Sequence, residues 1–178
     1  MVVDPNVFES TCLLLLDTYR QKNAAYGNNM SMNFRKYGEV AYAMRISDKL
    51  GRLKNLRENP DISAGDESIM DTLLDAVNYC ILCVGDIAAY AVGGKHNTVN
   101  VAFTEELLKD LPRHPEFMYK AYDRVVGEPY DLMAMLDDAF DSDNMALGCY
   151  NLAILLLVEY HLELDKHNNV ASVEDMSC

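Results

Sequence analysis

The stretch ESIMDTLLDAVNYCILCVGDIAAYA, residues 67–91, decides the fold of this chain. It contains no proline, and its apolar residues recur with the spacing of an amphipathic helix. Glu67, Asp71 and Asp75 follow at i, i+4 and i+8, and Asn78 comes three residues later. At about 100° per residue, these four side chains share a sector of roughly 80° on an otherwise apolar helix. The helix therefore carries an acidic stripe along one side.

Two explanations of this acidic stripe remain open. Like charges at i, i+4 repel each other by a few tenths of a kcal/mol, so the stripe needs a compensating partner. The partner is either a divalent cation with a phosphate-bearing ligand, or solvent and the basic side chains of a neighbouring helix. Carboxylates are hard oxygen ligands, and they favour Mg²⁺ or Mn²⁺ over zinc.

A second polar stripe lies on the helix predicted just before the acidic one, over residues 39–58. Arg45, Asp48, Lys49 and Arg52 recur at i, i+3, i+4 and i+7, and three of these four are basic. The connection between the two helices is short, so we expect them to be antiparallel neighbours. The basic stripe then either pairs with the acidic one or holds the phosphates that a metal ion bridges.

The N-terminal part of the chain has clear helix boundaries. Asp4 followed by Pro5 predicts a helix start, and the apolar pattern continues to about residue 22. Residues 28–37 are rich in Asn and Ser and are predicted to be a loop. Asp66 is placed to be the N-cap of the acidic helix.

The C-terminal part is predicted to be a loop followed by four helices. The loop covers residues 96–103, with a short extended piece. The first predicted helix begins near residue 104, the second covers 116–126, the third begins at residue 129, and the fourth covers 143–166. The last is apolar nearly all round, which is typical of a bundle centre or a subunit interface. We therefore expect a homo-oligomer with this helix at the interface.

Composition limits the kinds of partner. The chain has 178 residues and a net charge of −13, which argues against binding long nucleic acid. A single nucleotide is compatible with this charge, because a metal ion can supply positive charge. The sequence has neither a signal-peptide pattern nor an apolar run of ~20 residues, so no membrane association is expected.

Five cysteines, an odd number without a secretion signal, indicate reduced thiols in a cytoplasm. Cys80 and Cys83 form a CxxC pair inside the apolar helix. Because further zinc ligands at suitable spacing are not evident, we expect these two side chains to be packed in the core.

Three segments carry a resemblance to a known family. They are KNAAYG at 22–27, RISDKLGRLKNL at 45–56 and ESIMDTLLDAVNY at 67–79. In this order they resemble the nucleotide-modification-associated domain 1 family of phages and bacteria. The resemblance covers about residues 5–92 and implies a role in nucleotide metabolism without fixing a reaction.

A looser resemblance is to the all-α pyrophosphohydrolases of the MazG and dimeric dUTPase type. Asp71-Thr-Leu-Leu-Asp75 resembles the second acidic motif of these enzymes. They bind Mg²⁺ with carboxylates on two adjacent helices and cleave nucleoside triphosphates to the monophosphate and pyrophosphate. Their first helix usually carries a Glu-x-x-Glu pair, where this chain offers only Asp48.

The expected fold is an all-α helical bundle forming one domain over 1–178. It has a MazG-like core at 5–92 that binds nucleotide and metal, and helices at 104–167 for packing or oligomerisation. The expected roles fall into three sets. The metal ligands are Glu67, Asp71, Asp75 and Asp48; the catalytic residues are Asp71, Asp75 and Lys49; the substrate-binding residues are Lys22, Asn23, Tyr26, Arg45, Arg52 and Asn78.

In this scheme Lys49, Arg45 and Arg52 neutralise phosphate charge. Lys22, Asn23 and Tyr26 meet the base and sugar, although Tyr26 fits a core position equally well. The leading expectation is Mg²⁺-dependent (or Mn²⁺-dependent) hydrolysis of a deoxynucleoside triphosphate. The alternatives are a protein that binds a nucleotide without turning it over, and a structural helical subunit whose charged stripes only pair with each other.

Overall fold

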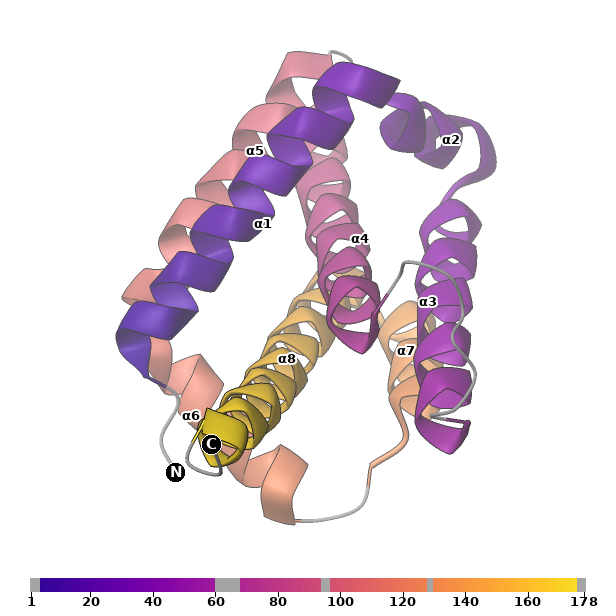
Figure 1. Ribbon diagram of the computed structural model, residues 1–178. Helices are drawn as coiled ribbons and strands as arrows, with labels where there is room; N and C mark the ends of the chain where they lie inside the picture. Colours follow the sequence, from indigo (N-terminus) through magenta and orange to yellow (C-terminus); the bar gives the residue numbers. More distant parts are fainter. Residues whose placement is uncertain (1–3, 60–67, 94–96, 128–129, 176–178) are drawn as a thin grey trace.

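The computed structural model describes residues 4–59, 68–93, 97–127 and 130–175, and within these ranges every regular element is helical (Figure 1). The all-α prediction is therefore confirmed. The helices are α1 (Pro5–Tyr26), α2 (Asn29–Tyr37), α3 (Val40–Glu58), α4 (Ile69–Ala91), α5 (Asn97–Asp110), a 3₁₀ turn (Leu111–Arg113), α6 (Pro115–Gly127), α7 (Leu132–Asp141) and α8 (Met145–Asp175).

Helices α4 and α8 lie side by side at the centre of the bundle (Figure 1). α3 and α5 also pack on α4, α6 and α7 pack on α8, α1 lies along α5, and α2 contacts α3. α3 and α4 run antiparallel, as their short connection predicts. Buried hydrophobic side chains from α1 and from α3 to α8 join in one core cluster.

Helix α8 is buried on all sides along residues 152–161. A single chain covers this stretch, so its apolar circumference is explained by its place at the bundle centre. The helix also extends beyond the predicted range of 143–166. The homo-oligomer stays a prediction, which light scattering at micromolar concentration tests.

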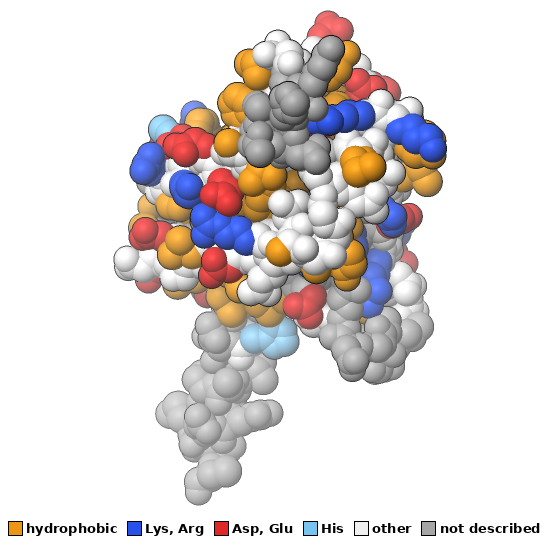
Figure 2. All heavy atoms as spheres, turned by 90° about the horizontal axis from the view of Figure 1, so that it is seen from above, with side chains coloured by type: hydrophobic (Ala, Val, Ile, Leu, Met, Phe, Trp, Pro, Cys, Tyr) orange, Lys and Arg blue, Asp and Glu red, His pale blue; other side chains and the backbone are white. Residues whose placement is uncertain are grey.

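Two helices are long and apolar enough to cross a membrane by length and composition, namely α4 and residues Met145–His167 of α8. In each, 61% of the most apolar window is buried inside the protein. The two helices pack against each other and against the surrounding helices, and these contacts bury much of their apolar surface. Seen from above, basic and acidic side chains are mixed with small groups of hydrophobic ones (Figure 2).

Residues 28–37 are mostly a helix, so the predicted loop is wrong. The backbone N–H of Met32 donates to the carbonyl oxygen of Asn28 at 3.0 Å, and Gly38 ends the helix at φ 70°. Phe34 packs on Tyr42 of α3 with 5.7 Å between ring centroids. Because only one face of this short helix contacts the core, its composition is mostly polar and resembles that of a loop.

Residues 97–110 form one continuous helix, where a loop and a later helix start were predicted. Asn100, Thr104 and Leu108 recur at i, i+4 and i+8, and each is 1% exposed. Gly85 of α4 allows this close packing, because a Cβ there would lie 2.3 Å from the Thr104 hydroxyl oxygen. Tertiary contacts thus outweigh the low helix propensity of the β-branched residues in this segment.

The first helix start was predicted correctly, and the start of α4 was misplaced. Asp4 accepts the backbone N–H of Asn6 at 2.8 Å and caps α1, which extends to residue 26 rather than 22. The N-cap of α4 is Ser68, whose hydroxyl oxygen accepts the N–H of Asp71 at 3.1 Å. The predicted cap, Asp66, lies outside the described residues.

Candidate functional site

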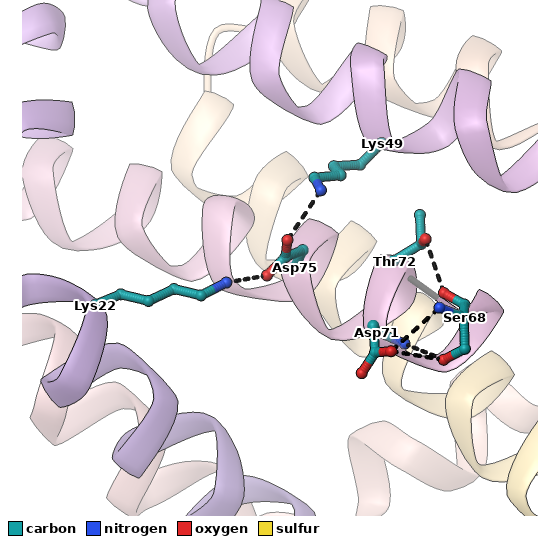
Figure 3. Close-up of polar contacts among 6 residues, drawn as sticks. All are labelled: Lys22, Lys49, Ser68, Asp71, Thr72 and Asp75. Atoms are coloured by element: carbon teal, nitrogen blue, oxygen red, sulfur yellow. Dashed lines mark hydrogen bonds and ion pairs between the residues drawn. The ribbon is translucent and has the colours of Figure 1, made fainter. Parts of the chain in front are cut away.

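Asp75 of α4 lies between two lysines that come from different helices (Figure 3). Lys22 of α1 pairs with Oδ1, and Lys49 of α3 pairs with Oδ2 at 2.9 Å. Burial alone raises the pKa of the Asp75 carboxyl, but the two ammonium groups outweigh it and hold that pKa below its ordinary value. Of the two explanations left open for the acidic stripe, pairing with basic side chains therefore applies to Asp75, which contacts Lys49 of the basic stripe and Lys22 of α1.

Asp71, one turn earlier, faces the start of its own helix (Figure 3). Its Oδ2 accepts the backbone N–H of Ser68 at 3.1 Å and the Ser68 hydroxyl at 2.8 Å. This reciprocal capping satisfies N–H groups that a helix start otherwise leaves unpaired. The acidic stripe is therefore divided between a helix cap and a lysine cluster, and Glu67 lies outside the described residues.

Asp75 and Asp71, two of the four expected ligands, do not fit a magnesium site in the contacts they make. A Mg²⁺ site needs oxygen ligands gathered in near-octahedral geometry. Both oxygens of Asp75 meet lysine ammonium groups, and one oxygen of Asp71 accepts two hydrogen bonds. Within the part of the chain that the structure describes, no group of three or more His, Cys, Asp or Glu side chains could hold a metal ion.

A cavity of about 400 Å³ opens beside Asp75, between α1, α2, α3 and α4. We call it the α1–α4 cavity, and its size is within the range of small-molecule sites. Six side chains expected at the site line it: Lys22, Asn23, Tyr26, Arg45, Asp75 and Asn78. The other lining residues were not among the expected site residues: Tyr19, Gly27, Asn28, Asn29, Met30, Asn33, Tyr79 and Leu82.

Two of these wall residues have informative surroundings. Tyr26 is 75% exposed, so its place is at the cavity rim and not in the core. Asn78 is only 8% exposed, and its amide nitrogen has no hydrogen-bond partner among the described residues. Leaving a buried donor unpaired costs ~1–3 kcal/mol. A residue of the cavity wall therefore carries a buried N–H group without a hydrogen-bond partner among the described residues.

A second cavity of about 620 Å³, the α3–α4 cavity, adjoins the first, and the two share Arg45 and Tyr79 in their walls. The expected residues Asp48, Lys49 and Arg52 line this second cavity. The described residues that line the two cavities include four cationic side chains and two carboxylates, in a chain whose net charge is −13. Cationic side chains that line a cavity attract anions.

A buried polar network behind the α1–α4 cavity was missed by the sequence analysis. Asp86 of α4 is 5% exposed and accepts the Tyr42 hydroxyl at 2.5 Å and the Asn100 amide at 2.7 Å. The Asn100 amide also donates to Ser31 at 2.5 Å and exchanges 3.2 Å hydrogen bonds with Asn28 in the cavity wall. The network thus fixes that wall to the core.

The one available signal for this network was an aspartate in the most apolar part of α4. Burial, followed by the nearby Asp86 carboxylate, raises the pKa of the Tyr42 phenol well above its ordinary value. Tyr42 therefore stays protonated and acts as the donor to Asp86.

The CxxC cysteines are packed in the core, as predicted. Cys80 and Cys83 are fully buried, and Cys83 lies 3.8 Å, sulfur to sulfur, from Cys149 of α8. Burial raises the pKa of the Cys80 thiol well above its ordinary value, which disfavours the reactive thiolate.

Comparisons with known proteins add no relative: no family model, curated protein or solved structure matches the chain. The resemblance to the nucleotide-modification-associated family therefore still rests on the three sequence segments alone.

Proposed function

We propose that this chain binds a small nucleotide in the α1–α4 cavity. The observation that supports this most strongly is the convergence of residues from three separate segments on one cavity. Lys22, Arg45 and Asn78 are far apart in the sequence and come from α1, α3 and α4, yet they line the same wall. Cations and an unpaired amide donor suit a ligand that has a phosphate and a hydrogen-bonding ring or sugar.

Binding without turnover is the version that the side-chain contacts favour. Two of the four carboxylates expected to hold Mg²⁺ are engaged: Asp75 by lysines and Asp71 by a helix start. Lysine and arginine side chains recognise phosphate directly, without a metal ion. A protein of this kind sequesters or senses a nucleotide.

Thermal melts with a panel of nucleotides, including cyclic ones, test this proposal. A ligand that binds only the folded state stabilises it by RT ln(1 + [L]/Kd), about 2.7 kcal/mol at a hundredfold excess over Kd. At least one nucleotide should raise the melting temperature of the wild type, and Lys22→Gln should reduce that rise. Lys109→Gln, which removes a cation from α5 outside both cavities, is the matched control and should keep the rise. An unchanged wild-type melt across the whole panel refutes nucleotide binding.

Mg²⁺-dependent hydrolysis of a deoxynucleoside triphosphate is the second candidate function. It is favoured by the positions of Asp48 and Asp75 on adjacent antiparallel helices, where the pyrophosphohydrolase resemblance requires carboxylates. Incubating the protein with nucleoside triphosphates and Mg²⁺ and then separating the products tests it. Monophosphate and pyrophosphate are expected from hydrolysis, and an unaltered nucleotide that still stabilises the protein leaves binding alone.

A further inference from the structure

The α1–α4 cavity changes its chemistry along the axis of α4. Asp75, Asn78 and Leu82 all lie in its wall. With a rise of about 1.5 Å per residue, the first and last of these positions are roughly 10 Å apart along the helix. Along α4 the wall changes from the Asp75 carboxylate, through the Asn78 amide, to the apolar Leu82, and Met30 of α2 adds further apolar surface to the cavity.

The charged end already holds one anionic group. Lys22 and Lys49 approach the Asp75 carboxylate from opposite sides (Figure 3). A carboxylate and a phosphate offer similar oxygen acceptors to an ammonium group, and a phosphate offers more oxygens and more charge. The two lysines thus form a built anion site in which Asp75 is the resident anion.

We infer that the ligand is a nucleoside phosphate lying lengthwise along α4, with its phosphate replacing the Asp75 carboxylate between Lys22 and Lys49. Its ring then lies beside Leu82 and Met30, and the amide N–H of Asn78 donates to an acceptor on the nucleoside. This inference rests on the proposed function and adds an orientation to it. It also moves Lys22 from the base and sugar, where the sequence placed it, to the phosphate.

Removing the charge of Asp75 should strengthen phosphate binding if Asp75 is a competing anion. The same change should weaken phosphate binding if Asp75 is a metal ligand. If Asp75 competes with the phosphate, Asp75→Asn should bind inorganic phosphate about tenfold more tightly than the wild type, because the internal competitor has lost its charge. Lys22→Gln should bind phosphate more weakly. Asp17→Asn removes a charge from the exposed face of α1, outside both cavities, and should leave phosphate affinity unchanged.

The ring end is tested separately with Asn78→Leu, which keeps the side-chain size and removes the donor. This variant should bind a nucleoside 5′-monophosphate at least tenfold more weakly and bind inorganic phosphate like the wild type. Circular dichroism and melting of each variant show that it is folded. Isothermal titration with phosphate, the common nucleosides and their 5′-monophosphates supplies the affinities.

The outcomes separate this inference from the proposed function. If Asp75→Asn binds nucleotide as tightly as the wild type, or more weakly, the anion exchange is overturned and the proposed function stands. An equal gain in Asp75→Asn and Asp17→Asn overturns it as well, because the effect is then one of net charge. Equal losses of phosphate and nucleotide affinity in Asn78→Leu overturn the orientation. If the wild type and Asp75→Asn bind neither phosphate nor nucleotide, both the inference and the proposed function fall.

Discussion

The contact between Gly85 and Thr104 is where the packing of α4 against α5 can be tested most sharply. A Cβ added at Gly85 would lie 2.3 Å from the Thr104 hydroxyl oxygen, but 3.4 Å from the Thr104 Cβ and from the Asn100 carbonyl oxygen. The first distance is a severe overlap, whereas the other two are ordinary contacts. Only the hydroxyl oxygen therefore stands in the way of an alanine.

The free energy of unfolding follows from two opposing terms. Overpacking a core site costs ~1–3 kcal/mol, whereas replacing a helical glycine by alanine stabilises by up to ~1 kcal/mol. Gly85→Ala alone should thus destabilise by about 1–2 kcal/mol. In a Thr104→Ala background the same change should be neutral or stabilising, so the coupling between the two sites should be ~1–3 kcal/mol.

Urea unfolding of the wild type, the two single variants and the double variant measures this coupling as a double-mutant cycle. A coupling below ~0.5 kcal/mol, the usual error of additivity, refutes the close approach of α4 and α5. Two other helical glycines serve as controls. Gly51→Ala meets no atom within 4 Å and should stabilise by up to ~1 kcal/mol. At Gly148 the Cβ would lie 2.7 Å from the Cα of Ala139, so removing a side chain cannot relieve the cost.

Three further predictions concern buried groups. Burial lowers the pKa of His161 below its ordinary 6.5, so the unfolded chain takes up the proton more readily. The contribution of His161 to stability should thus be complete above pH 6.5 and should be lost as the pH drops below 6.5. In thermal melts, His161→Phe should lack this loss of stability. Tyr42→Phe deletes the hydroxyl that donates to buried Asp86 and should lower the free energy of unfolding in urea by ~1–3 kcal/mol. An unchanged free energy of unfolding would count against the buried network. Cys80→Ser and Cys83→Ser should each cost ~1–2 kcal/mol and leave nucleotide affinity intact; a folded variant that no longer binds would assign the thiols a functional role.

The sequence predicted those parts of the fold where local chemistry and long-range packing agree. Asp4 followed by Pro5 marks a helix start in any context, and the long apolar pattern of α4 leaves little choice of structure. The sequence-based predictions were wrong where contacts with other helices determine the local structure. α5 is helical because Asn100 and Thr104 face α4, and neither residue has the apolar character that marks a buried helical face.

The sequence predicted several of the residues that belong to the candidate site, but it did not predict which of them contact each other. Lys22 and Asp75 are 53 positions apart, and no local pattern shows that they meet. The position of Asp71 was predictable in principle, because Ser68 and an acidic residue three positions later form a capping box. Asp86 was overlooked because an isolated carboxylate in an apolar stretch has no sequence signature of its own partners.

The central pairing of α4 with α8 has a consequence for biosynthesis. Roughly fifty residues separate the end of α4 from the start of α8, so the ribosome completes α4 well before its main partner exists. At a translation rate of 5–20 residues per second, the apolar surface of α4 stays without that partner for about 3–10 s. The nascent chain during this interval is more prone to aggregate than the finished protein, and chaperone demand during expression should peak before residue 145 is translated.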